Sequence, residues 1–245
     1  PGQRPEVLRR VIGSPLLHTA LQGFLELRDL PPTRGNCRYL FAGAARPTPD
    51  VYPVPGPIAV AAVDGLAAPC PDLDTQRDLL VHHAGSLGDE DRPWQVASHA
   101  LVSLAMVASE DAARLLPLHA THPNPFVRAY AARAAGVLGD TALLRSLSGD
   151  VDANVRTASV SALFGLEGHD VDDVLIAQLR GDDSPLAAES PPLQADDARP
   201  GGDDPQLLLT VAGLLEGTPS REESAKAAMD AFERISAAER ETWRD

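Results

Sequence analysis

The chain has 245 residues, a formal net charge of −14 and only 4% aromatic residues. The excess of acidic residues and the lack of any Lys/Arg cluster exclude a typical nucleic-acid binder, which needs a surface that neutralises phosphates. No apolar stretch of the sequence is long enough to span a bilayer.

The composition predicts helices. Ala and Leu are abundant, and runs of strand-favouring residues are scarce, which favours closely packed helices over a sandwich or a barrel. The chain begins at Pro1, and its last residues, ERETWRD, are typical of a helix. We therefore expect a fragment or a processed form of a longer protein, from which a signal peptide could have been removed.

Residues 31–57 are rich in proline, which blocks long helices and strand ladders. We expect an irregular Pro-rich segment there, with one short helix around CRYLFAGA. Cys37 lies in this segment and Cys70 follows it. Two free thiols are the simpler interpretation, and a disulfide across the Pro-rich stretch, which would imply an oxidising compartment, is the alternative.

One pattern occurs several times along the chain: a polar turn, a branched apolar residue or Leu, and then a helix of small and apolar residues. Its copies are GPIAVAAVDGLAA, DRPWQVASHALVSLAMVA, PNPFVRAYAARAAGVLGD, DANVRTASVSALFGLEGHD and DPQLLLTVAGLLEGTP. The dipeptide Val127-Arg128 returns as Val155-Arg156, 28 residues later. Alignment on it gives the expected core positions Ile58, Val96, Val127, Val155 and Leu208.

Partner helices of similar length are predicted between these copies by apolar residues at i, i+3 and i+4, over 74–87, 110–122, 140–150 and 170–182. Asp140 and Asp170 stand at N-cap-like positions, and Gly149 and Gly181 stand at C-terminal ones. Each unit is thus a helix, a turn and a second helix. Neither helix can bury its apolar stripe alone, so neighbouring units must stack.

The quoted stretches resemble HEAT repeats, particularly the short bacterial kind called phycocyanobilin-lyase-like. The resemblance implies an all-α fold over 1–245: a single right-handed α-solenoid of stacked antiparallel helix pairs, with about five to six units. It also implies that Arg128 and Arg156 form a ladder with turn aspartates, for which Asp140, Asp150 and Asp152 are the candidates. Ala97 and Leu209 occupy the equivalent Arg positions elsewhere, so the ladder would cover only the middle of the array.

A looser resemblance links the chain to the HEAT array that accompanies cyclophilin-type prolyl isomerase domains in some bacterial proteins. It implies an accessory arm of a folding catalyst, although no Phe-His-Arg segment of the isomerase occurs here. A bilin lyase-like protein is a further alternative, because this subtype of repeat is named after such enzymes.

Residues 181–204 interrupt the repeat with prolines and an excess of acidic residues. We expect an acidic, flexible insertion loop, with a docking segment for a basic partner as the alternative. Trp94, Tyr130 and Arg133 are candidate contact residues for a partner. The alternative is that Trp94 caps the core between two units, and that Phe126 and Tyr130 pack against the neighbouring unit.

The sequence contains no G-x-S-x-G elbow, phosphate-binding glycine loop or clear metal-ligand set, and the adjacent His82 and His83 and the pair His119 and His122 are best explained as surface or helix-end residues. We therefore expect a non-enzymatic scaffold module for protein–protein interaction, without a cofactor. The partner would be a protein or peptide with basic character, given the net charge. We expect a soluble protein, either cytoplasmic or periplasmic.

Overall fold

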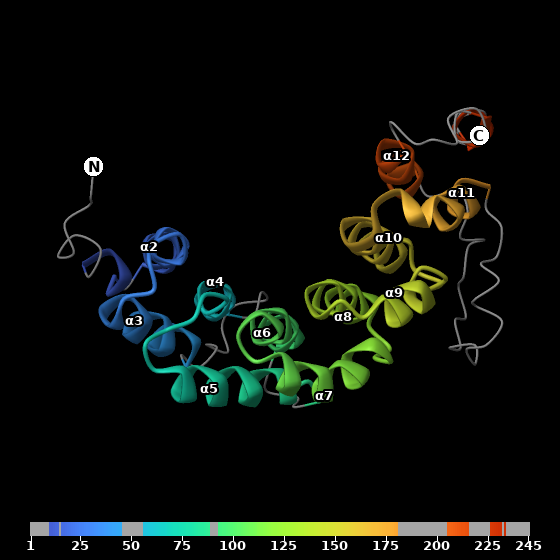
Figure 1. Cartoon of the computed structure of the whole chain (residues 1–245). Coiled ribbons are helices and arrows are strands. Elements are labelled where there is room, and N and C mark those ends of the chain that lie inside the picture. Colours follow the sequence, from blue (N-terminus) through green and yellow to red (C-terminus); the bar gives the residue numbers. More distant parts are fainter. Residues whose placement is uncertain are drawn as a thin grey trace. The chain divides into compact units, whose positions relative to one another are not determined.

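The computed structural model describes residues 10–14, 16–45, 56–88, 93–180, 205–215, 226–231 and 233. Over these ranges the chain forms helices and no strands, so the predicted all-α class is confirmed for them (Figure 1). In the same ranges no helix combines the length and the apolar character needed to cross a membrane. The chain divides into two compact units, Pro1–His119 and Ala120–Asp245.

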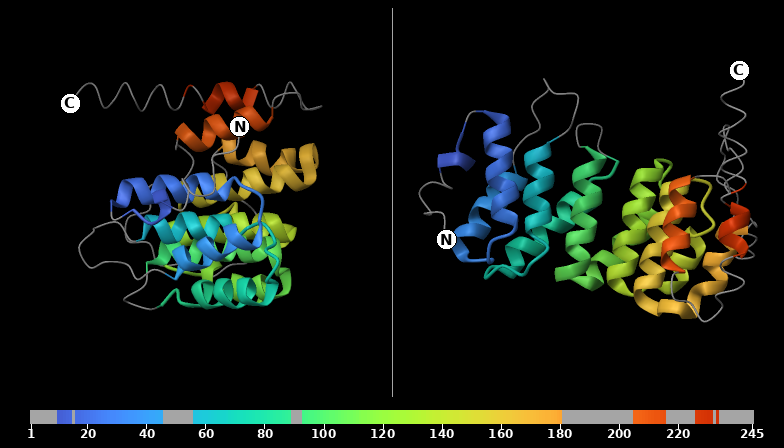
Figure 2. Two further views of the ribbon diagram at one scale, coloured as in Figure 1. Left: turned by 90° about the vertical axis from the view of Figure 1, so that its left-hand side faces the viewer. Right: turned by 90° about the horizontal axis from the view of Figure 1, so that it is seen from above.

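The first unit holds two layers of helices. The bounds are α2 (Leu17–Arg28), α3 (Arg34–Ala44), α4 (Pro57–Gly65), α5 (Leu73–Gly85), α6 (Trp94–Val107) and α7 (Ser109–Ala120), whose last residue belongs to the second unit. Helix α4 packs between α2 and α6, and α3 and α5 form a second row, which lies below the first in Figure 1 (see also Figure 2). Helix α2 lies in the part of the chain where the repeat pattern is weak.

Local signals explain where these helices begin. The hydroxyl of Thr33 accepts from the Asn36 amide at 3.3 Å, and the Asp72 carboxylate accepts from the Thr75 amide at 3.2 Å. Side-chain oxygens of this kind satisfy amides that a helix start leaves unpaired. No proline follows Thr33 until Pro47, so α3 is longer than the short helix expected inside the Pro-rich segment. Residues 46–55 of that segment lie outside the described residues.

A disulfide ties α3 to the loop that follows α4. It joins Cys37 and Cys70, both of which are buried, so the interpretation of two free thiols is wrong. The buried side chain of Gln76 holds the same loop: its Nε2 donates to the Leu66 carbonyl at 2.6 Å, and its Oε1 accepts from the Cys70 amide at 2.8 Å. The loop is therefore fixed both covalently and through backbone groups that would otherwise be buried without partners.

The second unit repeats the two-layer arrangement. Its helices are α8 (Pro125–Leu138), α9 (Thr141–Leu147), α10 (Ala153–Glu167), the 3-10 helix η1 (Gly168–Val171), α11 (Asp172–Arg180) and α12 (Pro205–Leu214). Helix α10 packs between α8 and α12, α9 contacts both α8 and α10, and α11 contacts α12 (Figures 1 and 2). The acidic segment predicted as a loop, 181–204, lies outside the described residues.

Small residues allow α8 and α10 to approach closely. Ala131, Ala132, Ala134 and Ala135 of α8 are completely buried. A Cβ atom built on Gly136 would lie 2.9 Å from the Cβ of Ala162 in α10, so the two backbones leave no room there for a larger side chain. Gly139 ends α8 with a φ of 71°, a left-handed conformation that favours glycine.

Candidate functional site

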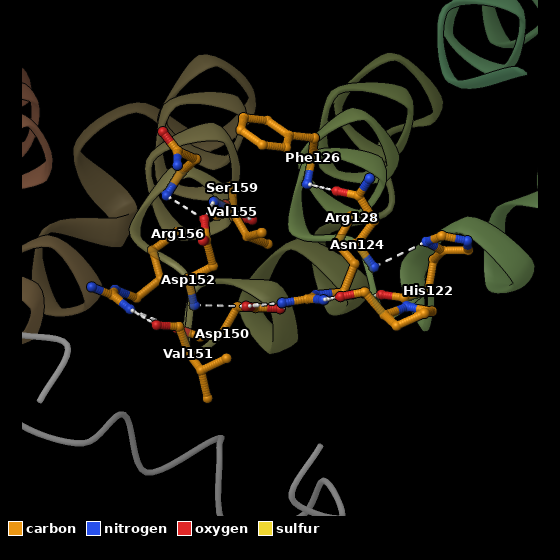
Figure 3. A network of polar contacts seen from close by, with 12 residues as sticks. His122, Asn124, Phe126, Arg128, Asp150, Val151, Asp152, Val155, Arg156 and Ser159 are labelled. Atoms are coloured by element: carbon orange, nitrogen blue, oxygen red, sulfur yellow. Dashed lines mark hydrogen bonds and ion pairs between the residues drawn. The ribbon is translucent and has the colours of Figure 1, made fainter. Parts of the chain in front are cut away.

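The residues that carry the repeat meet at the N-terminal turns of α8 and α10 (Figure 3). Asn124 caps α8, with its Oδ1 accepting from the Phe126 amide at 2.9 Å, and Pro125 occupies the first turn. Asp152 caps α10, with its Oδ1 accepting from the amides of Asn154 and Val155. Proline is favoured at a helix start because its missing N–H would lack an intrahelical partner in any case.

Arg128 links two turns of the second unit. Its Nε and Nη2 each donate to the Asp150 carboxylate at 2.7 Å, the bidentate geometry that suits a planar guanidinium. Its Nη1 donates to the carbonyls of His122 and Pro123 at 2.9 and 3.0 Å. Asp150 also accepts from the Asp152 amide at 2.9 Å. A single buried arginine thus ties the turn before α8 to the turn before α10.

Arg156 repeats half of this pattern in α10. Its Nη1 donates to the carbonyls of Asp150 and Val151 at 2.7 and 3.0 Å, the positions six and five residues upstream, as Arg128 does with His122 and Pro123. Asp150 is therefore shared: its carboxylate serves Arg128 and its carbonyl serves Arg156. The two arginines are 4% and 5% exposed, so these bonds lie away from water.

The Arg128–Asp150 ion pair is buried, and this determines its electrostatics. The hydrogen bonds to Asp150 raise the pKa of Arg128 above its ordinary value, burial opposes the rise, and the charges of Asp150 and Asp152 add to it. The guanidinium is therefore always charged. The Arg128–Asp150 pair is a structural element: the cation is permanent, and four of its five N–H groups donate to fixed protein oxygens.

Of the three aspartates proposed as ladder partners, the structure brings only Asp150 to an arginine. Asp140 instead caps α9, with its Oδ1 accepting from the Leu143 amide at 3.0 Å, and Asp152 caps α10. The physical reason is position, because a carboxylate one residue before a helix lies beside that helix's unpaired amides. Asp152 attracts Arg128 only through its charge. Asp170, expected to cap a helix, lies within η1.

The five expected core positions are all buried: Ile58, Val96, Val127, Val155 and Leu208. Ala97, which stands in the Arg position of α6, is also buried, whereas the side chain of Leu209 lies outside the described residues.

The three proposed contact residues have different surroundings. Trp94 is the first residue of α6 and is half-buried. Tyr130 is half-buried on α8, and the exposed Arg133 guanidinium stacks on its ring, 4.5 Å from the centroid. Phe126, on the same helix, is 53% exposed, so the packing role considered for it covers at most half of the side chain.

Several polar contacts of the first unit were missed in the sequence. Asp111 of α7 is bound by Arg77 of α5, whose Nε is 2.5 Å away, and by Arg114. His99 of α6 lies 2.6 Å from Asp64 of α4. The pairs Arg77–Asp111 and His99–Asp64 join different helices at separations that no repeat alignment relates, whereas Asp111 and Arg114 lie on the same helix. A charged residue at i+3 from Asp111 was the only available signal.

Two of the histidines weighed as metal ligands make other contacts. His119 is completely buried and its Nε2 lies 3.0 Å from the Ala84 carbonyl, while His122 Nδ1 accepts from the Asn124 amide at 3.1 Å. Among the described residues, no three side chains of the metal-binding types gather at one place.

Comparison with known proteins adds little to this geometry. No family model matches the chain, and no curated protein matches it. The crystal structure of an engineered protein is similar at 17% identity over 95% of this chain and 96% of that chain, with a TM-score of 0.42. A likeness of that size carries no argument, and function has to be argued from the residues.

Proposed function

We propose that the chain is a non-enzymatic binding module, in which HEAT-like helix pairs stack as an α-solenoid and present helix faces to a protein or peptide partner. The observation that supports this most directly is the exposed side of α8. Its buried side is fixed by alanines, Gly136 and the Arg128–Asp150 pair, while Phe126 and Val137 remain 53% and 42% exposed. A rigid helix that presents large apolar side chains to solvent is the kind of surface proteins use for recognition.

The interior of the second unit supports a structural role for its charged residues. Arg128 and Arg156 donate to fixed backbone or carboxylate oxygens, and Asp140 and Asp152 cap helices. These groups therefore hold the shape of the module, and the exposed faces are left for recognition. By analogy with solenoid proteins, the packed helices supply a fixed shape and the exposed faces supply the binding surface.

We propose that the protein resides in an oxidising compartment. The support is the buried Cys37–Cys70 disulfide, since disulfides persist in exported proteins and are rare in a reducing cytosol. Alkylation of the protein in rapidly acid-quenched cells, before and after reduction, tests this. Modification of two thiols only after reduction is the expected result, and two thiols open to modification beforehand would contradict it.

Affinity capture tests the binding function. The full chain is immobilised, and proteins retained from extracts of the producing cells are quantified against Tyr130→Glu and against a chain lacking 181–204. We expect specific proteins that are retained by the deletion variant and lost with Tyr130→Glu, at unchanged helix content. Failure to enrich any protein over blank beads, at low and physiological salt, would count against a binding module.

A further inference from the structure

Four residues form one continuous stripe along α8. Phe126, Tyr130, Arg133 and Val137 are spaced by four, three and four residues, which places them on one side of a helix. All four are exposed or half-exposed, whereas Val127, Ala131 and Ala134 between them are buried. At 1.5 Å per residue the stripe is about 16 Å long, enough for a peptide segment of about five extended residues.

Beside this stripe, the neighbouring helix α10 presents only small or short side chains. The positions of α10 equivalent to the four stripe residues, one repeat later, are Asn154, Ala158, Ser161 and Gly165, all small or short and at least partly exposed. The close approach at Gly136 and Ala162 brings the two helices together. Figure 3 shows Phe126 on the side of α8 that faces α10. The side chains of the α8 stripe therefore project further than these four short, uncharged residues of α10, which we call the shelf.

Arg133 makes the stripe positively charged. It is the single charged residue on the exposed side of α8, and the shelf residues of α10 are uncharged. Other arginines of the second unit bind protein oxygens: Arg128 binds Asp150, Arg145 binds Glu167, and Arg156 binds backbone carbonyls. Arg133 forms no ion pair with a carboxylate of the described residues, and its guanidinium instead stacks on Tyr130.

Stacking orients a guanidinium without using its hydrogen-bond donors. The N–H groups point outward in the plane of the group, so an arginine that lies over an aromatic ring can still bind a carboxylate in bidentate fashion. The ring reduces the freedom that Arg133 would lose on binding, which improves affinity. Apolar side chains at both ends of the stripe, Phe126 and Val137, offer contacts for apolar groups on either side of that carboxylate.

We infer that the α8 stripe binds a short segment of a partner protein in which an Asp or Glu is flanked by aromatic or aliphatic side chains. The inference rests on the proposed binding function and names its partner by charge. It departs from the basic partner that the net charge suggested. Since charges more than about 8 Å apart are largely screened at physiological salt, the residues next to the bound segment decide the preference more than the total charge.

Selection from a library of random 12-residue peptides, displayed on phage, tests the inference with the full chain as target. We expect the enriched peptides to combine Asp or Glu with aromatic or aliphatic residues. The synthetic forms should bind with affinities that fall at least tenfold on Arg133→Glu and on Phe126→Ala. Arg38→Glu, an equal charge change on an exposed residue of α3, and Leu118→Ala, an exposed leucine of α7, are the matched controls and should change binding less than twofold.

Each other outcome is decisive. Enriched basic peptides, or acidic peptides whose binding survives Arg133→Glu, would overturn the inference while leaving the binding function in place. A library that yields no binder at all would overturn both. Binding that appears only when 181–204 is deleted would show that the chain's own acidic segment occupies the stripe, which also overturns the assignment to an external partner. Circular dichroism of each variant verifies that the helices are intact.

Discussion

Arg128 uses all three of its guanidinium nitrogens for hydrogen bonds while only 4% exposed. Removal of one member of such a buried pair leaves the other charge without compensation, at a cost of about 3–5 kcal/mol. We expect Arg128→Ala to lower the free energy of unfolding by this amount in urea denaturation followed by circular dichroism. Arg145→Ala, which removes the half-exposed pair with Glu167, is the control and should cost about 0–1 kcal/mol. Equal losses for the two variants would contradict the role assigned to Arg128.

His122 makes the start of α8 sensitive to pH. Burial, aided by the charge of Arg128, lowers the pKa of His122 below its ordinary value of 6.5. The unfolded chain therefore binds more protons than the folded one between the two pKa values. The contribution of His122 to stability is complete above pH 6.5 and is lost as the pH falls through the folded-state pKa.

The corresponding variant is His122→Gln, which cannot be protonated but keeps an acceptor for the Asn124 amide. We expect the free energy of unfolding of the wild type to decrease more than that of the variant between about pH 7.5 and about pH 5. Urea titrations at several pH values measure this difference. Parallel pH curves for the two proteins would show that His122 contributes no pH dependence.

The aspartates show where sequence reasoning stopped at this scale. Asp140, Asp150 and Asp152 all lie in turns, and the N-cap-like position of Asp140 was the one sequence signal that could have ranked them as partners of an arginine. The ranking depends on whether a free helix amide or a guanidinium is the nearer donor. Asp140 and Asp152 each directly precede a helix and cap it, which leaves Asp150, two residues further from the helix start, to Arg128.

At the scale of elements, the two glycines of α8 and α10 have opposite expected effects. Gly136 faces Ala162, so Gly136→Val should separate the helices and lower stability by about 1–3 kcal/mol. Gly165 of α10 has no atom within 4 Å of an added Cβ, so Gly165→Ala should raise stability by about 0.5–1 kcal/mol through helix propensity. Thermal and urea unfolding measure both. A Gly136→Val protein as stable as wild type would refute the close packing described for this pair.

Helix positions were predictable where periodicity and capping agree. The copies that begin with DRPWQ, PNPF and DANV correspond to α6, α8 and α10. Helices α8 and α10 combine apolar residues at helical spacing with N-cap side chains that bond to their amides, whereas α6 was predicted from its spacing alone. α2 has no N-cap side chain that bonds to its amides, so its start carried no such signal. η1 was also missed. Gly168 adopts a positive φ there, and the chain makes a 3-10 turn before α11 begins at Asp172.

At the scale of the whole molecule, the disulfide acts on the first unit alone. It closes a loop between residues 33 positions apart, for which chain-entropy arguments give about 3–4 kcal/mol. In a variant with both Cys37→Ser and Cys70→Ser, we expect faster amide hydrogen exchange in α3, α4 and α5, with exchange in α8 and α10 unchanged. Adding a reductant to this variant should have no further effect. Unchanged exchange in α3 to α5 would show that the covalent link is dispensable.

Total charge was the weakest predictor at this scale. The value of −14 directs attention away from nucleic acids, but it averages the charge over all surfaces of the molecule. The described exposed side of α8 carries a cation, Arg133, while Asp140 and Asp152 of the same unit cap helices. Pairing could not be read from composition, since it depends on which turns lie next to which helices.

Because Asp150 is shared by two repeats, the peptide bond after it is a natural point for inserting a further repeat. Each arginine reaches back to the two residues that open its own turn, and Arg128 reaches forward to the last residue of its repeat. A second copy of residues 123–150 inserted between Asp150 and Val151 would bring its own arginine and its own aspartate, and the copied arginine would have the native Asp150 carbonyl six residues upstream and the copied Pro123 carbonyl five residues upstream. The native sequence after the insertion would find an aspartate ahead of it, as it does now. Residues 123–150 therefore form a unit whose end fits its own beginning, so the array can be lengthened by whole repeats without redesigning the turn between them.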